Sequence, residues 1–357
     1  MAEQLPGGST VYVVRRGSLR RRRRRRWGRI LLLLGVGVAV LLGGGVVAGN
    51  LVADHYAAAI RRQDILAHVP ASERAQDAPV TGPLDILLLG SDNAAGARGK
   101  EGVTGQRSDS MMLIHVGRAF RRVVVVSIQR DAYVDIPAVP GRWPGGKAKI
   151  NQALDLGGPA LSIRTVQNLL GIKIDHVVVV GFDALRKVTD AVGGVDVHID
   201  SAIYDPRFPR QTWTVGWHHL DGRRAEAYVR QRYGLPGSDY DRIKRQQQYL
   251  HALTAKASSL GVLSSPSRLD ALFTAITSSL TVDTTMPVKG LAFAARGLDS
   301  GNVTFATMPM SGLLRVGGVD YEQVDADAAR ALGQAVNTDD FGPYFAAYPP
   351  NDATHGY

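Results

Sequence analysis

The sequence predicts an α/β fold, a layered α-β-α domain around a mixed central sheet, preceded by one transmembrane helix. Three observations lead to this prediction. Short, almost uninterrupted apolar runs that end at glycine or polar residues are typical of strands buried on both faces. Segments with apolar positions at helical spacing are interleaved with those runs, which indicates helices layered on a sheet. A long uncharged stretch also lies close to the N-terminus.

The uncharged stretch is the first element. Residues 30–53 would span about 36 Å as a helix, enough to cross a bilayer. Ten arginines and one glutamate precede it, so residues 1–29 hold +9 of the formal net charge of +10. The positive-inside rule places this basic tail in the cytoplasm. We predict a single-pass anchor in the cell membrane with the C-terminal part extracytoplasmic, and a cleaved secretory signal is the alternative.

Composition divides the remaining residues into three parts. Residues 54–83 are polar and predict a stalk. Residues 84–338 carry the strand and helix patterns and predict the folded domain, for which the hydrophobic content of 45% is sufficient. Residues 339–357 are rich in Pro, Gly and Tyr and predict an irregular C-terminal tail.

Within the domain, buried or alternating apolar runs predict strands, and apolar residues at helical spacing predict helices. The expected strands are 84–89, 111–116, 123–128, 177–180, 195–199 and 303–308. The expected helices are 158–170, 183–192, 239–258, 266–280, 287–297 and 324–335.

Composition and missing motifs exclude several classes of function. The chain has no cysteine, which removes thiolate metal sites and cysteine nucleophiles. Once the tail's +9 is subtracted from +10, about +1 is left for the rest, so we expect no nucleic-acid partner. The sequence also lacks a G-x-S-x-G elbow, a Walker A loop, an H-E-x-x-H zinc motif and a Rossmann glycine fingerprint.

Two aspartates flank the first pair of predicted strands. Asp92 lies just past the strand at 84–89, and Asp109 opens the strand at 111–116. Antiparallel pairing would bring both carboxylates to one end of the sheet. Mg²⁺ binds through one or two carboxylates together with phosphates and water, so the pair suits one such ion. Ordinary turn chemistry is the alternative for either aspartate.

Arg130 and Asp131 follow the third predicted strand, 123–128. Side chains at such strand ends project into the crevice above an open α/β sheet, where ligands bind. A surface ion pair is the alternative reading of any neighbouring Arg and Asp.

The segment 230–246 is the richest in arginine outside the tail. On a helix, Arg242, Arg245 and Gln246 stand at i, i+3 and i+4 and share one face. Arg230 and Arg232 add two more guanidinium groups from the preceding element. The planar guanidinium bonds two phosphate oxygens at once, so this set fits a diphosphate, and such a concentration of arginines needs an anion to neutralise it.

These residues lie in a series of motifs that resembles the LytR-CpsA-Psr (LCP) family of cell-envelope glycopolymer transferases. The resemblance runs in order from residue 84 to about residue 256, with a weaker continuation to 335. The matching segments are LLLGSDN at 87–93, RSDSMM at 107–112, VSIQRD at 126–131, KIN at 149–151, GGP at 157–159, GGVDV at 193–197 and DYDRIKRQQ at 239–247.

The resemblance implies a catalytic domain over residues 84–338. Its activity would be that of an Mg²⁺-dependent phosphotransferase, with Mn²⁺ as an alternative ion and pyrophosphatase activity as a side reaction. It would move a glycopolymer from a polyprenyl diphosphate carrier onto peptidoglycan during cell-wall assembly, at the surface of the cytoplasmic membrane and in contact with its lipids. The family also buries the lipid tail in an apolar pocket of the fold.

The resemblance also assigns roles to residues. Asp92 and Asp109 would hold the metal, and Arg130, Asp131 and Arg242 would be catalytic. The residues that would bind the diphosphate are Arg107, Arg130, Lys149, Arg230, Arg232, Arg242, Arg245 and Gln246.

The chain departs from the family pattern in three ways. Gln129 stands where proline is usual, the loop between Asp92 and Asp109 is long, and no further C-terminal module follows. The long loop leaves Arg98 and Arg107 as alternatives for one clamp position. Asp131 is our candidate for the general base.

Two other functions stay open. One is a membrane-anchored transcriptional attenuator or regulator whose basic tail contacts nucleic acid, although residues 1–29 contain no helix-turn-helix pattern. The other is a non-catalytic binder of polyprenyl phosphates or envelope polyanions, which would use the same arginines without turnover.

Overall fold

A computed structural model describes residues 60–75, 82–91, 108–204, 212–231, 233–237, 239–257, 265–288 and 303–353. Within these ranges, no helix combines the length and apolar character that a membrane span requires. The predicted anchor at 30–53 lies outside the described residues, as does most of the predicted helix at 287–297.

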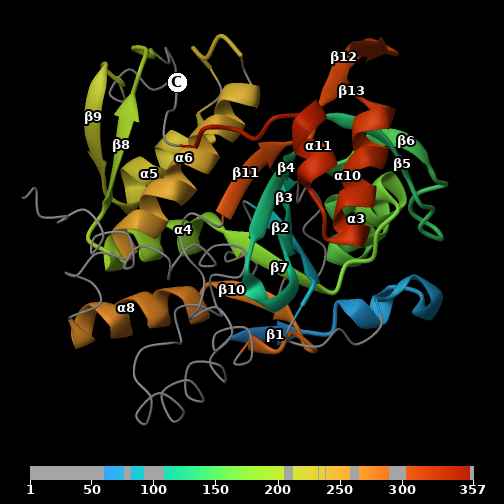
Figure 1. Ribbon diagram of the computed structural model, residues 1–357, viewed down its shortest axis with the longest axis horizontal. Helices are drawn as coiled ribbons and strands as arrows, with labels where there is room; N and C mark the ends of the chain where they lie inside the picture. The colour runs from blue at the N-terminus through green and yellow to red at the C-terminus, as the bar shows by residue number, and fades with distance from the viewer. Residues whose placement is uncertain are drawn as a thin grey trace, which may run out of the picture.

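The core of the fold is a mixed seven-stranded sheet built from the described strands, ordered β1-β10-β7-β2-β3-β4-β11 (Figure 1). β7 pairs parallel with β2, β3 pairs antiparallel with both β2 and β4, and β4 pairs parallel with β11. The strands are β1 (Arg61–Gln63), β2 (Leu84–Ser91), β3 (Ser108–Val116), β4 (Val123–Ile128), β7 (His176–Gly181), β10 (Leu280–Asp283) and β11 (Val303–Thr307). The predicted mixed sheet is confirmed.

Both faces of the sheet are buried, as the continuous apolar runs predict. In β2, Ile86 and Leu88 belong to one apolar cluster and Leu87 and Leu89 to another on the opposite face. This division follows from the period of two along a strand.

Helices cover both faces (Figure 1). The first cluster packs against α4 (Phe182–Ala191), α5 (Gly222–Arg230), α6 (Asp239–Ala257) and α8 (Pro266–Thr277). The second packs against α3 (Gln152–Leu170), α10 (Ala326–Thr338) and α11 (Gly342–Ala347). The predicted α-β-α layering is therefore confirmed.

Glycines explain two features of α3. The helix begins six residues before the predicted start at 158, because Gly157 and Gly158 interrupt its pattern; Gly158 has a φ of 69°. At its other end, a Cβ on Gly333 of α10 would lie 1.8 Å from the carbonyl oxygen of Leu170. Only glycine lets the two helices approach this closely.

A smaller four-stranded sheet, ordered β12-β13-β5-β6, lies beside α3 and α10 (Figure 1). Its strands are β5 (Ala132–Ile136), β6 (Gly146–Lys149), β12 (Met310–Val316) and β13 (Val319–Val324). The sequence did not predict these strands, because they are short and expose much of one face. The predicted strand at 195–199 is β8 (Val195–Ile199), which forms a hairpin with β9 (Gly216–Leu220) outside the central sheet.

Both ends of the described domain extend beyond the predicted boundaries of 84 and 338. In the expected stalk, β1 pairs with β10, and Ile65 and Val69 are buried in the core. In the expected irregular tail, α11 buries Tyr344, and Asn351 forms a bridge with Phe305. On the C-terminal side, aromatic side chains at helical spacing supply these contacts, namely Phe341, Tyr344, Phe345 and Tyr348.

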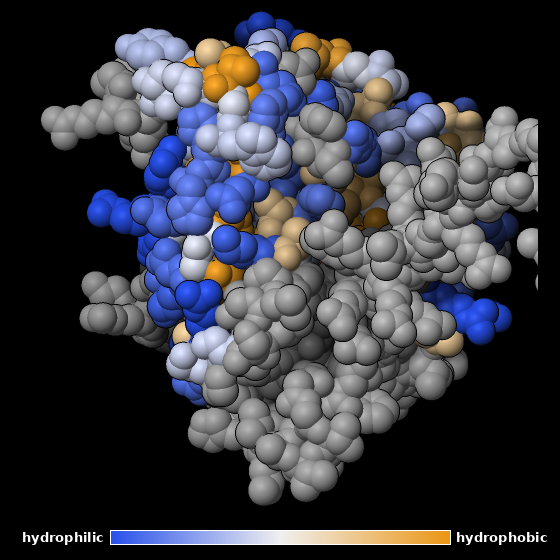
Figure 2. All heavy atoms as spheres, turned by 60° about the vertical axis from the view of Figure 1, so that its left-hand side comes forward, coloured by the Kyte–Doolittle hydropathy of each residue, from blue (hydrophilic) through white to orange (hydrophobic). Residues whose placement is uncertain are grey.

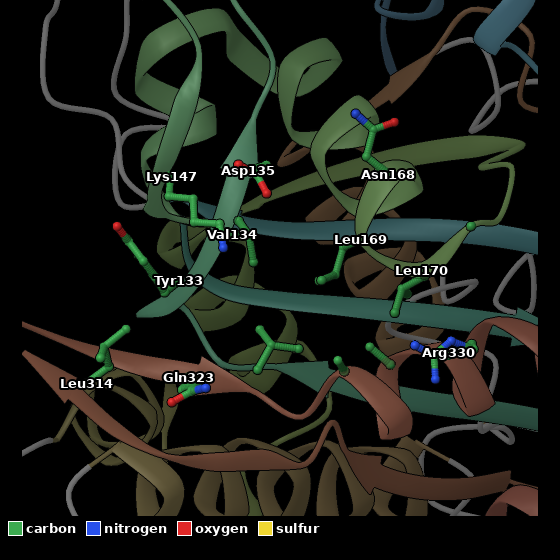
Figure 3. A pocket seen from close by; sticks show the side chains of 14 residues that line it. Tyr133, Val134, Asp135, Lys147, Asn168, Leu169, Leu170, Leu314, Gln323 and Arg330 are labelled. Carbon is green, nitrogen blue, oxygen red and sulfur yellow. The ribbon is translucent and has the colours of Figure 1, made fainter. Parts of the chain in front are cut away.

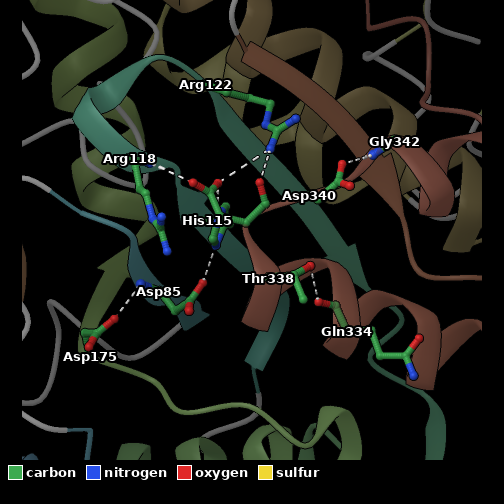
Figure 4. Close-up of polar contacts among 10 residues, drawn as sticks. Asp85, His115, Arg118, Arg122, Asp175, Gln334, Thr338, Asp340 and Gly342 are labelled. Carbon is green, nitrogen blue, oxygen red and sulfur yellow. Dashed lines mark hydrogen bonds and ion pairs between the residues drawn. The ribbon is translucent and has the colours of Figure 1, made fainter.

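A buried ionic network ties the C-terminal segment to the sheet at the edge where β2 begins (Figure 4). His115 is fully buried, with Nδ1 2.8 Å from Oδ1 of Asp85 and Nε2 3.0 Å from Oδ1 of Asp339. The backbone N–H of Arg118 donates to Oδ2 of Asp339, and Arg122 donates to its carbonyl. We call His115, Asp85, Asp339 and Arg122 the amino-edge network.

The face that carries β8, β9 and α5 is mostly hydrophilic in its described residues, with small apolar groups among them (Figure 2). Trp217 and Val215 are among the exposed apolar side chains of this hairpin region.

Candidate functional site

The candidate site lies at the carboxyl edge of the central sheet. β2, β4, β7 and β11 run in one direction, so their carboxyl ends meet at this edge, and β3 begins there. Ser91 pairs with Ser108, which confirms the antiparallel pairing predicted to bring positions 92 and 109 together. Asp92, Arg98, Arg107 and Arg232 lie outside the described residues, as does the side chain of Asp109.

A rigid turn presents Arg130 and Asp131 at the end of β4. The backbone N–H of Ala132 donates to the carbonyl of Gln129 at 3.2 Å. The carbonyl of Arg130 accepts from the N–H of Asn151, and that of Asp131 accepts from the N–H of Glu322 at 2.9 Å. Three elements therefore fix the turn, as the strand-end position predicts for a ligand-binding residue.

Arg130, Asp131, Lys149, Asp239 and Arg242 form one cluster, here called the arginine–aspartate cluster. Arg130 Nε lies 3.4 Å from Oδ1 of Asp239 and 3.8 Å from Oδ2 of Asp131. Arg242 Nη2 donates to Oδ2 of Asp239 at 2.9 Å, and Lys149 Nζ lies 3.3 Å from Oδ1 of Asp131. The structure thus brings together four residues that the sequence assigned to the site.

Asp239 is the bridge of this cluster. It is the first residue of α6 and 6% exposed, and the helix dipole favours a carboxylate at that position. The sequence assigned Asp239 no role, because its contact with Arg130 joins residues more than a hundred positions apart. Three cations and two carboxylates leave the cluster with one excess positive charge.

Glu322 and Tyr240 border the cluster and were missed in the sequence. The Tyr240 hydroxyl donates to Oε2 of Glu322 at 3.4 Å. Burial, with the charges of Asp239 and Asp131, raises the pKa of Glu322, and burial beside Glu322 raises that of Tyr240 to about 12. No local motif marks Glu322, since it reaches the site through the pairing of β13 with β5.

Arg245 stands three residues after Arg242 on α6 and contacts residues outside the cluster. It is 0% exposed, with its guanidinium carbon 4.4 Å from the centre of the Tyr228 ring and 5.8 Å from that of Trp213. Nη1 donates to Oε1 of Gln231, and its Nε and Nη2 have no hydrogen-bond partner among the described residues. Burial lowers the pKa of Arg245 to about 10, so it remains a cation at neutral pH.

The remaining predicted clamp residues make contacts outside the cluster. Arg230 donates to Glu226 and lies 4.5 Å from the ring centre of Phe182, at the carboxyl end of β7. Gln246 is buried and donates to the carbonyl of Val229. The predicted shared face of Arg242, Arg245 and Gln246 is buried as expected, but Asp239 and Glu226 already neutralise part of the arginine charge.

The described residues do not test the predicted metal site. Among the described side chains, no group of three His, Asp or Glu residues is arranged to hold a metal. The expected metal ligands, Asp92 and the side chain of Asp109, lie outside the described residues, so the metal site stays a prediction.

Comparison with known proteins agrees with this architecture. The LytR_cpsA_psr family model matches residues 48–338. The chain belongs to the LytR_cpsA_psr family. The resemblance noted in the sequence motifs is therefore confirmed, and the match includes the segments that carry the arginine–aspartate cluster.

Two curated relatives are similar over most of the chain. "Cell wall biosynthesis protein LcpA" of Corynebacterium glutamicum is 33% identical over 294 residues, 71% of this chain and 56% of that protein. "Polyisoprenyl-teichoic acid--peptidoglycan teichoic acid transferase TagU" of Enterococcus faecalis is 32% identical over 68% of this chain and 75% of its own length. The chain thus spans little more than half of the LcpA protein.

Solved structures share the fold. Bacillus subtilis TagV superimposes with a TM-score of 0.58 at 28% identity, over 72% of this chain and 97% of that chain. A structure described as TagT bound to LIIa-WTA gives a TM-score of 0.56 at 27% identity, over 75% and 94% of the two chains.

Proposed function

We propose that this protein is a phosphotransferase that moves a glycopolymer from a polyprenyl diphosphate carrier onto peptidoglycan. The observation that carries the proposal is the arginine–aspartate cluster at the carboxyl edge, whose five residues have a net positive charge, together with the buried Arg245 on the same helix as Arg242. Relatives named as a teichoic acid transferase and a cell wall biosynthesis protein support the substrate class.

The proposed reaction needs no nucleotide, because the diphosphate donor is already activated. An acceptor hydroxyl oxygen forms a bond to the phosphorus that bears the glycopolymer. The bond from that phosphorus to the bridging oxygen breaks, and the bridging oxygen leaves as part of polyprenyl monophosphate. The hydroxyl proton passes to Asp131. Water in place of the sugar hydroxyl gives the pyrophosphatase side reaction.

The cluster would act mainly by positioning and by stabilising charge. Arg130 and Arg242 would bind the phosphate oxygens, and Lys149 would hold Asp131 in place through the 3.3 Å ion pair. Arg230, beside Phe182, would reach the diphosphate from the α5 side. Asp92 and Asp109 would hold Mg²⁺, which supplies additional positive charge at the phosphates when bound.

We also propose that residues 30–53 anchor the chain in the cell membrane, with the described domain outside the cytoplasm. A donor carried on a polyprenyl lipid is confined to the membrane, so an anchored domain meets its substrate at the bilayer surface.

The test is the release of polyprenyl phosphate from a radiolabelled polyprenyl diphosphate oligosaccharide by the full-length protein in detergent, with Mg²⁺ and a peptidoglycan acceptor. We expect turnover that chelation with EDTA abolishes and added Mg²⁺ restores. Arg130→Ala and Arg242→Ala should each reduce the rate by about 10³-fold.

Arg268→Ala, at an exposed arginine of α8, is the matched control and should retain the full rate. Full activity of either cluster variant would overturn the assigned clamp. Binding of the donor without release of polyprenyl phosphate in the wild-type protein would identify a non-catalytic binder instead.

A further inference from the structure

The small sheet next to the cluster has one exposed face, of which the proposed donor chemistry uses only Lys149. The register places Tyr133 opposite Lys149 and Asp135 opposite Lys147. On the other side Tyr133 is opposite Gln323. Paired residues share a face and alternate residues return to it, so these side chains and Tyr321 lie together, while Val134 and Ile136 face the core.

We propose that this tyrosine–lysine face, made by Tyr133, Tyr321, Lys147 and Lys149, binds the acceptor as a saccharide chain that bears carboxylates. The inference deepens the proposed function and rests on it. The face supplies aromatic surface for sugar rings and ammonium groups for acidic substituents. Peptidoglycan with its stem peptides has this chemistry.

The two tyrosines supply the surface for stacking. Their ring centres lie 4.5 Å apart with the planes inclined by 53°, and both side chains are partly exposed. The C–H groups on one side of a sugar ring carry partial positive charge, and the face of an aromatic ring is negative. A tyrosine pair therefore offers a site for a pyranose ring.

The two lysines add positive charge at the same face. Lys147 Nζ lies 5.7 Å from the ring centre of Tyr133, and Lys149 Nζ lies 5.5 Å from that of Tyr321. Lys149 also contacts Asp131, whereas no ion pair of Lys147 is found within the described part of the chain. Lys147 is thus available for a carboxylate of the ligand.

The face continues into the arginine–aspartate cluster on one side. Lys149 Nζ is 3.3 Å from Asp131, which in turn lies 3.8 Å from Arg130. A saccharide on the tyrosines would therefore bring a neighbouring hydroxyl toward the proposed phosphate and base. The polar character of the face suits an acceptor glycan and not the polyprenyl part of the donor, which needs apolar surface.

On the other side the face borders a cavity of about 670 Å³ (Figure 3). In this view Tyr133 and Lys147 lie at one end and Arg330 at the other. Gln323 and Asn168 also line it and offer amide groups for sugar hydroxyls. Its volume falls within the range of small-ligand sites and leaves room for further sugars of the chain.

Direct binding measurements with the full-length protein in detergent test the proposal. The probes are a soluble peptidoglycan tetrasaccharide with free stem-peptide carboxylates and chitotetraose, which lacks carboxylates. We expect Tyr133→Ala to weaken both probes by about five- to tenfold. Lys147→Gln should weaken only the carboxylate-bearing probe, by about threefold. Tyr204→Ala, at a tyrosine 57% exposed on another part of the surface, is the matched control.

Unchanged affinity of both probes in Tyr133→Ala would overturn the subsite, and so would an equal loss in Tyr204→Ala. Equal effects of Lys147→Gln on the two probes would overturn the carboxylate assignment. Polyprenyl phosphate release by the wild-type protein is measured separately. Its absence would contradict the proposed function, whereas release combined with unaltered probe binding would contradict the subsite alone.

Discussion

At the carboxyl edge of the sheet, Asp239 forms ion pairs with two guanidinium groups from different elements, whereas at the opposite edge His115 lies between the carboxylates of Asp85 and Asp339. Both are ionic networks at the ends of the central sheet, but they lie on different elements. The amino-edge network uses both ring nitrogens of a fully buried histidine and joins segments distant in sequence. The arginine–aspartate cluster keeps an excess positive charge and borders an exposed face.

We infer that the amino edge serves stability and that the carboxyl edge serves the proposed function. Buried ions whose partners all come from the chain hold the C-terminal segment in place. The arginine–aspartate cluster, with its surplus positive charge, can bind an anionic ligand. Four experiments test these two roles, and the one with the largest expected effect comes first.

Arg242→Lys tests whether the carboxyl edge needs a guanidinium and not only a charge. Lysine keeps the charge near Asp239 but loses the planar group that bonds two phosphate oxygens. We expect the rate of polyprenyl phosphate release to fall by about 10²-fold. The melting temperature, followed by circular dichroism, should change little. Arg268→Lys is the control, and an undiminished rate in Arg242→Lys would contradict a bidentate role.

Asp339→Asn tests whether the amino edge supports stability alone. Asp339 has a φ of 54° and ends α10, and asparagine tolerates this conformation while it removes the charge that faces His115. We expect the free energy of unfolding to fall by about 2 kcal/mol, measured in urea. Turnover below the melting transition should remain that of the wild type. A lost rate in the folded variant would show that the two edges are coupled.

The pH dependence of the free energy of unfolding should reveal the contribution of the amino-edge network. Burial alone lowers the pKa of His115, but hydrogen bonds and charges from Asp85 and Asp339 outweigh it and raise this pKa above its ordinary value of 6.5. This stabilisation is complete below pH 6.5 and is lost as the pH rises through the folded-state pKa.

Asp339 behaves in the opposite sense. Burial opposes the effect of its partners, His115 and the Arg118 N–H, which hold its pKa below 3.8. Its stabilisation is present above pH 3.8 and is lost in acid. Between pH 6 and 9 the wild type should therefore lose about 1 kcal/mol more stability than His115→Gln. Parallel urea titrations check this, and identical slopes would contradict the charged state of His115.

Tyr240→Phe should have the smallest effect. It removes the 3.4 Å hydrogen bond to Glu322 at the border of the cluster and leaves the ring in place. We expect a loss of at most about 1 kcal/mol in stability and about a threefold change in rate. A change of a hundredfold in the rate of polyprenyl phosphate release would give this hydroxyl a direct role in the reaction.

The sequence predicted most of the layered fold because its strands are buried on both faces. The almost uninterrupted apolar runs at 84–89 and 123–128 predict buried strands and exclude exposed ones. Helical spacing also predicted that Arg242, Arg245 and Gln246 share a face, and all three are buried. The small sheet was missed because the exposed residues of its strands, such as Tyr133 and Asp135, weaken the apolar pattern.

Contacts between residues distant in sequence were the second feature that the sequence could not predict. Spacing along α6 indicates that Asp239 can meet Arg242, but nothing local indicates that it also meets Arg130 from the end of β4. Glu322 reaches the site only because β13 pairs with β5. Residues 339–357 are rich in Pro, Gly and Tyr and predicted an irregular tail, whereas Phe341 and Tyr344 pack into the core.

The two edge strands of the described central sheet disfavour strand pairing between copies of this protein. β1 is only three residues long, and its exposed Arg61 and Arg62 place charge along that border. At β11, Asn351 covers part of the exposed strand edge. Its backbone N–H donates to the carbonyl of Phe305, and its side-chain amide donates to the hydroxyl of Thr307. Unpaired backbone groups on a sheet border can recruit a strand from another chain. The short, charged edge at β1 and the covered edge at β11 therefore disfavour aggregation.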